Sequence, residues 1–183
     1  STLSSVRAGG RKVRGKLRAS FRWPGGGPWP CVVERRGARR GLEASLANMP
    51  KEIGVKPEAI LMVSGHWEED DVAVMASPQP SMVYDYGGFP AFTYQIKYAA
   101  PGAPAVATRV EQLLKAAGLP THLDHTRGYD HGVFAPMQVM YPEANIPLLQ
   151  VAIQPIYDPA AHLALGRPLA PCAGDAVLLV GAA

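Results

Sequence analysis

The chain has 183 residues, of which 48% are apolar and 18% charged, so it is long enough and apolar enough to bury a core. Its 19 glycines and 18 prolines exclude a helical bundle and favour an α/β domain rich in turns. No apolar stretch approaches the roughly 20 residues that span a bilayer, so we expect no membrane partner. Cys31 and Cys172 lie far apart in the sequence, which argues against a disulfide framework or a cysteine zinc site.

The net charge of +3 is distributed unevenly. Residues 1–40 hold eleven basic residues against Glu34 alone, whereas residues 41–183 hold seven basic residues against fourteen acidic ones. We therefore predict a basic, poorly ordered N-terminal arm over 1–40 and an α/β domain over 41–183. The arm has the composition of a solvated extension, which we favour, of an organelle-import leader, or of a phosphate-binding segment. Because few aromatic residues interleave its charges, we do not expect nucleic-acid binding, and we expect a cytoplasmic location with organelle import as the alternative.

The first elements of the body can be predicted from apolar spacing and from Gly and Pro positions. A helix is expected over 39–48, ended by Pro50. The continuous apolar run at 58–65 predicts a strand buried on both faces, and a second short strand follows at 72–75. The segment 77–104 is then too long to be a simple connection.

Strands and helices alternate through the second half of the body. A helix is expected over 104–117, with Pro104 at its start and Gly118 at its C-cap. Further segments are expected as strands at 121–123, 147–153 and 176–180 and as helices at 133–140 and 160–169. This alternation predicts a single α/β domain with a mostly parallel or mixed central sheet flanked by helices.

Two histidines stand out as candidates for chemistry. His66 directly follows the predicted strand 58–65, and functional groups of open α/β sheets gather at the carboxyl ends of strands. His131 lies between Asp130 and Gly132, a composition suited to a positioned proton donor or acceptor. The alternatives are a structural histidine bonded to a loop carbonyl for His66 and a buried polar turn for His131.

The remaining polar motifs are interpreted as structural. The four acids at 68–71 are more typical of a solvated turn than of a cation site, and His122 and His125 would point to opposite faces of an extended segment. His162 is expected on the solvent side of a helix. The glycines at 25–27 lack the Lys-Ser/Thr of a phosphate loop, and no nucleophile elbow is present in the sequence.

Five sequence blocks occur in the order of one family. They are SGHW at 64–67, YDYGGFP at 84–90, YAAPGAP at 98–104, GYDHG at 128–132 and MYPEANIP at 140–147. Through them the chain resembles the class III extradiol ring-cleavage dioxygenases of the LigB type, in particular the DOPA 4,5-dioxygenase-like branch. The resemblance covers about residues 41–170.

The resemblance implies an α/β fold that holds a non-haem Fe(II), or zinc in some members, at the carboxyl edge of the sheet. A catechol-type aromatic and dioxygen are the implied small-molecule partners, and a homo-oligomer is possible. In this likeness His66 matches a metal ligand. His131 matches a pocket histidine that is both substrate-binding and catalytic, because it hydrogen-bonds the substrate or the oxygen intermediate.

Two departures from the family pattern affect the expected activity. Pro24 stands where the family has a ligand histidine before the glycines, and the sequence stops at Ala183, before the family's acid/base histidine and third ligand. We therefore expect a domain truncated or altered at both ends, with weak metal binding and impaired ring cleavage. The alternative is a non-catalytic relative that binds a small aromatic or a protein partner.

Overall fold

The computed structural model describes residues 20–22, 27–32, 39–155 and 158–182. Its strands are β1 (Ser20–Arg22), β2 (Ala59–Glu68), β3 (Val72–Met75), β4 (Thr121–Asp124), β5 (Leu148–Ile153) and β6 (Val177–Ala182). Its α-helices are α2 (Arg40–Ile53), α3 (Pro104–Ala116), α4 (His131–Met140), α5 (Pro159–Gly166) and α6 (Ala170–Gly174). Short 3-10 helices lie at η1 (Trp29–Cys31), η3 (Ala91–Gln95) and η4 (Arg167–Leu169).

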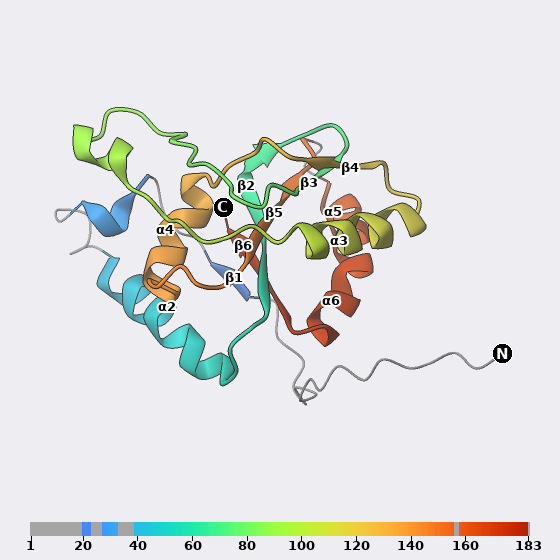
Figure 1. Cartoon of the computed structure of the whole chain (residues 1–183), viewed down its shortest axis with the longest axis horizontal. Coiled ribbons are helices and arrows are strands. Elements are labelled where there is room, and N and C mark those ends of the chain that lie inside the picture. Colours follow the sequence, from blue (N-terminus) through green and yellow to red (C-terminus); the bar gives the residue numbers. More distant parts are fainter. Residues whose placement is uncertain (1–19, 23–26, 33–38, 156–157, 183) are drawn as a thin grey trace.

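The strands form one mixed sheet in the order β1-β6-β2-β5-β3-β4. All pairs are parallel except β3 with β5, which meet in antiparallel orientation. Helices α2 and α4 lie on one side of the sheet, and α3, α5 and α6 lie on the other (Figure 1). The predicted fold class, a single α/β domain with a mixed sheet flanked by helices, is confirmed.

The core follows the central strand. Residues Ile60, Leu61 and Met62 of β2 are fully buried, as expected for a strand covered by helices on both faces. Phe134 of α4 and Leu114 of α3 are fully buried as well, on helices that cover opposite faces of the sheet. The sheet is thus the rigid layer on which the candidate site is built.

Helix boundaries differ from the sequence prediction. The helix expected over 160–169 is α5, which ends at Gly166 and is followed by the 3-10 helix η4. Two further differences have a clear cause. Helix α2 continues through Pro50 to Ile53 and ends at Gly54, which has φ +73° and donates its amide to the Pro50 carbonyl. A proline removes only one hydrogen bond of the helix, and the left-handed glycine cap closes the extra turn. Helix α4 begins at His131 instead of 133, because the Asp130 side chain accepts from the Val133 amide as an N-cap.

Part of the stretch predicted as a basic arm packs on the body. Strand β1 pairs in parallel with β6, and Trp29 is fully buried. Pro24, which stands where the family has a ligand histidine, lies outside the described residues. The division into an arm and a domain at residue 40 stays a prediction. No helix in the described part of the chain is long and apolar enough to cross a membrane.

Candidate functional site

An irregularity in the central strand sets the direction of the His66 side chain. Ser64 of β2 lies opposite Ala152 of β5, and Glu68 lies opposite Ile153, the next residue, so the β2 residues between them have no register partner on β5. A local bulge of this kind bends the strand and redirects its side chains. The His66 side chain is 32% exposed. Burial, followed by the proximity of the His131 ring, lowers the pKa of His66, so its imidazole is neutral at pH 7 and can offer a lone pair.

His131 is the first residue of α4 and is buried. Its ring centroid lies 4.1 Å from that of His66, with 50° between the ring planes. The two candidate histidines, 65 positions apart in the sequence, are thus neighbours at the carboxyl end of β2. The sequence argument from strand ends placed His66 at this edge, whereas His131 was singled out by its neighbours Asp130 and Gly132 and by the family resemblance.

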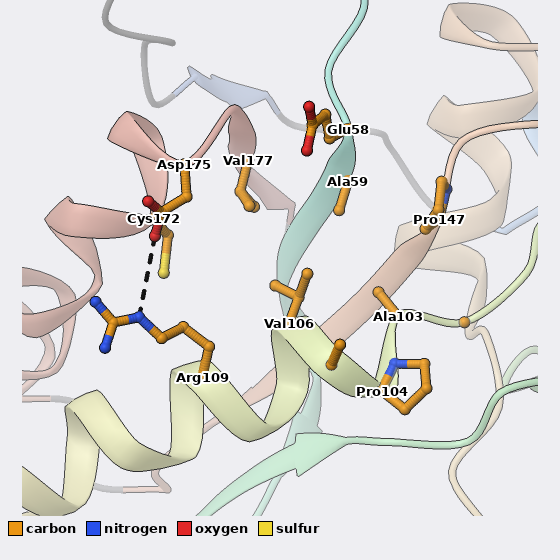
Figure 2. A pocket seen from close by; sticks show the side chains of 12 residues that line it. Glu58, Ala59, Ala103, Pro104, Val106, Arg109, Pro147, Cys172, Asp175 and Val177 are labelled. Atoms are coloured by element: carbon orange, nitrogen blue, oxygen red, sulfur yellow. Dashed lines mark ion pairs between the residues drawn. The ribbon is translucent and has the colours of Figure 1, made fainter. Parts of the chain in front are cut away.

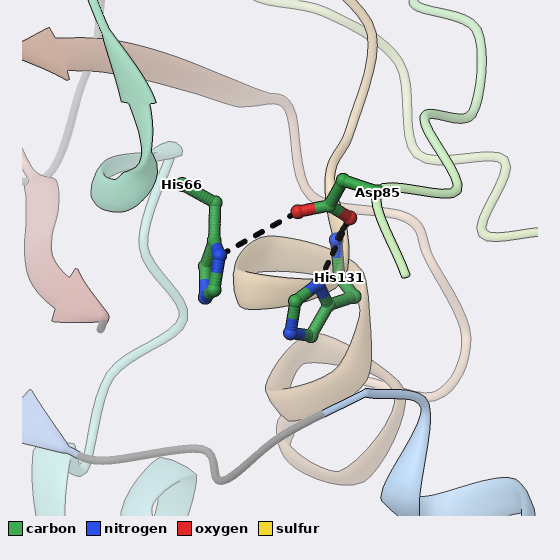
Figure 3. Close-up of side chains that lie close together, drawn as sticks. All are labelled: His66, Asp85 and His131. Carbon is green, nitrogen blue, oxygen red and sulfur yellow. Dashed lines mark hydrogen bonds and ion pairs between the residues drawn. The ribbon is translucent and has the colours of Figure 1, made fainter. Parts of the chain in front are cut away.

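Asp85 joins the two imidazoles (Figure 3). Its Oδ1 accepts from the backbone amide of His131 at 2.9 Å and lies 2.8 Å from His131 Nδ1. Its Oδ2 lies 3.6 Å from His66 Nδ1. Because a carboxylate can only accept, the Nδ1 contact assigns the proton of a neutral His131 to Nδ1. His131 Nε2 is then the free nitrogen, and it is buried without a hydrogen-bond partner in the described structure.

The loop that carries Asp85 is held by tyrosine hydroxyls. Tyr84 donates to the carbonyl of Ile96 and Tyr86 donates to the carbonyl of Thr93, both at 2.6 Å. Burial raises the pKa of Tyr86 to about 12, so its hydroxyl stays protonated as a donor. The Tyr86 ring also meets the His131 ring edge-on at 5.7 Å. The residues on both sides of Asp85 are therefore fixed, which orients its carboxylate before any ligand binds.

A glycine allows α4 to approach the end of β2 closely. A Cβ atom on Gly132 would lie 2.6 Å from Cδ2 of His66 and 3.0 Å from Oγ of Ser64. We expect Gly132→Ala to lower the free energy of unfolding by about 1–3 kcal/mol, because an added methyl group forces these atoms apart. Urea unfolding measures this change.

The control for that variant is Gly166→Ala in α5, where an added Cβ would meet no heavy atom within 4 Å. This substitution should be neutral or stabilise the protein by up to about 1 kcal/mol, since alanine is the better helix former. Equal stability of Gly132→Ala and the wild type would contradict the close packing of His66 on α4.

The Asp85 carboxylate predicts a pH-dependent contribution to stability. Burial acts to raise the pKa of Asp85, but hydrogen bonds from the side chain and backbone of His131 outweigh it, and the pKa lies below the ordinary 3.8. A carboxyl with a depressed pKa stabilises the fold above its unfolded value, and that stability is lost as the pH falls through the folded value.

The measurement is urea unfolding of the wild type and Asp85→Asn at a series of pH values. The stability advantage of the wild type should be present at about pH 5 and shrink on further acidification, since the amide does not titrate. An advantage that stays constant down to the acid limit of folding would show that the carboxylate is not stabilised by His131.

Asp85 was not singled out as a site residue from the sequence. One signal could have found it, because it is the single acidic residue in the long segment 77–104 and is flanked by two tyrosines. The remaining histidines lie elsewhere: His122 and His125 are exposed at and just after β4, and His162 lies on α5. None of them, and none of the acids at 68–71, belongs to a metal-competent group within the described residues.

The donor set of the site suits a metal ion. One ligand atom from each of His66, Asp85 and His131 lies within 4.8 Å of the others. Imidazole and carboxylate are the ligand types of the two-histidine, one-carboxylate non-haem Fe(II) sites, and His66 and Asp85 supply one of each. Asp85 can contribute Oδ2 beside the neutral His66 while its Oδ1 keeps the hydrogen bond to His131. The residues present thus fit a metal without disruption of that bond.

Two cavities elsewhere lack comparable chemistry. One of about 390 Å³ lies at the amino ends of β2 and β6, where an exposed ion pair joins Arg109 and Asp175 at 4.0 Å (Figure 2). Burial raises the pKa of the Cys172 thiol there, which keeps it protonated and unreactive. The other, of about 610 Å³, lies between α5, α6 and the sheet and is mainly apolar. The His-Asp-His group is therefore the stronger candidate for catalysis.

A mixed sheet flanked by helices, with His66 of its central strand beside His131 of α4 and the loop residue Asp85, defines a candidate metal-dependent enzyme. The family described as "Catalytic LigB subunit of aromatic ring-opening dioxygenase" matches residues 36–182. The chain belongs to this family.

Relatives and a solved structure agree with this assignment. The "4,5-DOPA dioxygenase extradiol" of Portulaca grandiflora is 46% identical over 69% of this chain and 47% of its own length. The protein of the same name from Beta vulgaris is 37% identical over 90% of this chain and 61% of its own length. A crystal structure of an uncharacterized Escherichia coli K12 protein has a TM-score of 0.61 and 32% identity, covering 76% of this chain and 51% of that one. The resemblance to the DOPA dioxygenase branch is confirmed, and the chain spans about half the length of its curated relatives.

Proposed function

We propose that this chain catalyses metal-dependent, dioxygen-consuming ring cleavage of a catechol-type aromatic, the extradiol reaction. Membership in the family and the names of the relatives support the reaction class. The observation that carries the proposal is the contact of Asp85 with both His66 and His131 at the carboxyl end of β2. This arrangement offers a metal-binding pair on one side and an oriented imidazole on the other.

His66 and Asp85 are the proposed metal ligands, Fe(II) being the metal we favour and zinc the alternative. A metal bound there would polarise the catechol oxygens and leave coordination positions for substrate and dioxygen. His66 supplies a neutral imidazole, and the Asp85 carboxylate supplies negative charge. The low pKa of Asp85 keeps it ionised at pH 7.

His131 is the proposed proton donor and acceptor and hydrogen-bonds the substrate. Its Nδ1 proton is held by Asp85, so a proton can be taken up or released only at Nε2. Asp85 stabilises the imidazolium that forms when Nε2 takes a proton. The Tyr86 ring, which meets the His131 ring edge-on at 5.7 Å, places an aromatic side chain beside this histidine that suits an aromatic ligand.

The direct test is oxygen uptake after anaerobic loading with Fe(II), with catechol, protocatechuate and DOPA as substrates. We expect uptake that requires both iron and a substrate. No uptake with iron bound would contradict the proposed reaction and favour a non-catalytic relative, which should bind a catechol without metal in a calorimetric titration. Weak turnover stays a prediction, because it rests partly on Pro24 standing in place of a ligand histidine. Rapid turnover would contradict it.

A cytoplasmic location and a homo-oligomeric state are also proposed. Neither bears on the chemistry of the site. Cell fractionation and sedimentation of the purified chain would test them.

A further inference from the structure

A buried carboxylate, Asp130, directly precedes His131 and contacts the strand that carries His66. The Asp130 side chain is fully buried. Its Oδ1 accepts from the Ser64 hydroxyl at 2.9 Å and from the Val133 amide at 3.2 Å. Its Oδ2 accepts from the Gln150 side-chain amide and from the Arg127 guanidinium, both at 2.8 Å. A buried charge is costly unless it is paired and hydrogen-bonded, and each oxygen here has two donors.

These donors come from different parts of the fold. Ser64 lies on β2, Gln150 on β5, Val133 on α4 and Arg127 on the segment that precedes α4. Asp130 is therefore the point at which the central strands are tied to the start of the helix. Through these contacts the Asp130 carboxylate can fix the position of α4 relative to the ends of β2 and β5.

Ser64 extends the contact from Asp130 to His66. Its hydroxyl donates to Asp130 and accepts from the backbone amide of His66 at 3.2 Å. This amide belongs to the bulged part of β2, whose residues have no register partner on β5. The direction of the His66 side chain thus depends on where Ser64 and Asp130 hold its backbone.

Asp130 acts on His131 through the backbone. The carbonyl of Asp130 accepts from the amides of Val133 and Phe134 at 3.0 and 2.9 Å, and its side chain caps the same turn. The place of His131 at the first position of α4 follows from this cap. One residue therefore controls both imidazoles through separate contacts.

We infer that Asp130 is a positioning residue that fixes the separation of His66 and His131, with Ser64 as its link to His66. No hydrogen bond joins its side chain to either ring in the described structure, and it acts through the Ser64 hydroxyl and the first turn of α4. The effect expected on turnover rests on the proposed function, whereas the effect on ring separation does not.

The experiment compares Asp130→Asn, Ser64→Ala and the double variant with the wild type. Asparagine keeps the size of aspartate and remains a good N-cap, but its NH₂ group can accept from neither Gln150 nor Arg127. Ser64→Ala removes the hydroxyl that joins Asp130 to the His66 amide and leaves the other three donors to Asp130 in place, and it keeps the inference testable if Asp130→Asn fails to fold. The control is Asp158→Asn. Asp158 is the exposed N-cap residue of α5, a helix on the other side of the sheet, and its side chain accepts from the Ala160 amide at 2.9 Å.

Two quantities are measured at a temperature where each variant is folded: kcat of the Fe(II)-loaded enzyme, and the nuclear Overhauser effect between ring protons of His66 and His131 in the metal-free protein. We expect each single variant to lower kcat about tenfold or more, as loss of groups that orient ligands does. The ring-to-ring signal should fall several-fold. The kcat and the ring-to-ring signal of the double variant should be no lower than those of the more impaired single variant, because both substitutions interrupt the same series of contacts.

A purely structural role would lower the thermal midpoint but leave the ring-to-ring signal and kcat of the folded protein at the level of Asp158→Asn. That result, or full additivity in the double variant, would overturn the inference. Loss of the ring-to-ring signal in a protein whose wild type cleaves no catechol would support the positioning role and refute the proposed function instead.

Discussion

Replacement of His131 by glutamine is expected to lower kcat for a catechol substrate by a factor on the order of 10² to 10⁴, the range found when a general acid or base is removed. Glutamine can form hydrogen bonds but cannot take up and release a proton near neutral pH. Asp85 occupies Nδ1 of this histidine, so the buried Nε2 is the atom whose function is lost. The measurement is oxygen uptake at matched iron content.

His122→Gln is the matched control for this substitution. His122 is an exposed histidine on β4 outside the candidate site, and its replacement should leave kcat unchanged. A His131→Gln enzyme that turns over as fast as the control would show that His131 transfers no proton in the rate-limiting part of the reaction.

Loss of His66 is expected to have the second large effect, on metal affinity. His66→Ala removes the neutral imidazole beside Asp85, and we expect the affinity for Fe(II) or Co(II) to fall at least about a hundredfold, the upper range seen for removal of merely orienting groups. Competition with a metal chelator measures this affinity without any turnover.

Exposed His125, which follows β4, provides the control for His66→Ala. His125→Ala should bind metal as the wild type does. If His66→Ala also retained wild-type affinity, the metal would lie elsewhere, and the assignment of His66 as a ligand would be wrong.

The fold was largely predictable where local signals are strong. Strand β3 has the predicted bounds, and Gly118 adopts the left-handed conformation, φ +78°, expected of a C-cap. The strand at 58–65 was predicted too short, because pairing resumes beyond the bulge and carries β2 to Glu68. The antiparallel contact of β3 with β5 was not predicted. It arises because only residues 69–71 separate β3 from β2, so the chain reverses there, and β5 runs parallel to β2.

The site was predictable only in part. His66 could be placed at the carboxyl edge of the sheet because it follows a predicted strand, and His131 could be joined to it only through the family resemblance. Asp85 arrives from a long loop whose shape depends on tyrosine hydroxyls bonded to the carbonyls of Ile96 and Thr93, and hydrophobic periodicity does not encode such contacts. The role inferred for Asp130 likewise depends on donors from separate segments that only the folded chain brings together.

The central claim is that His66, Asp85 and His131 form one metal-dependent site. Anomalous diffraction at the iron edge, from crystals loaded with Fe(II) under anaerobic conditions, tests it most directly. The account predicts an iron peak in contact with His66 and Asp85, with the His131 to Asp85 hydrogen bond preserved. An iron peak away from His66, or none at this end of β2 in crystals that retain iron, would contradict it.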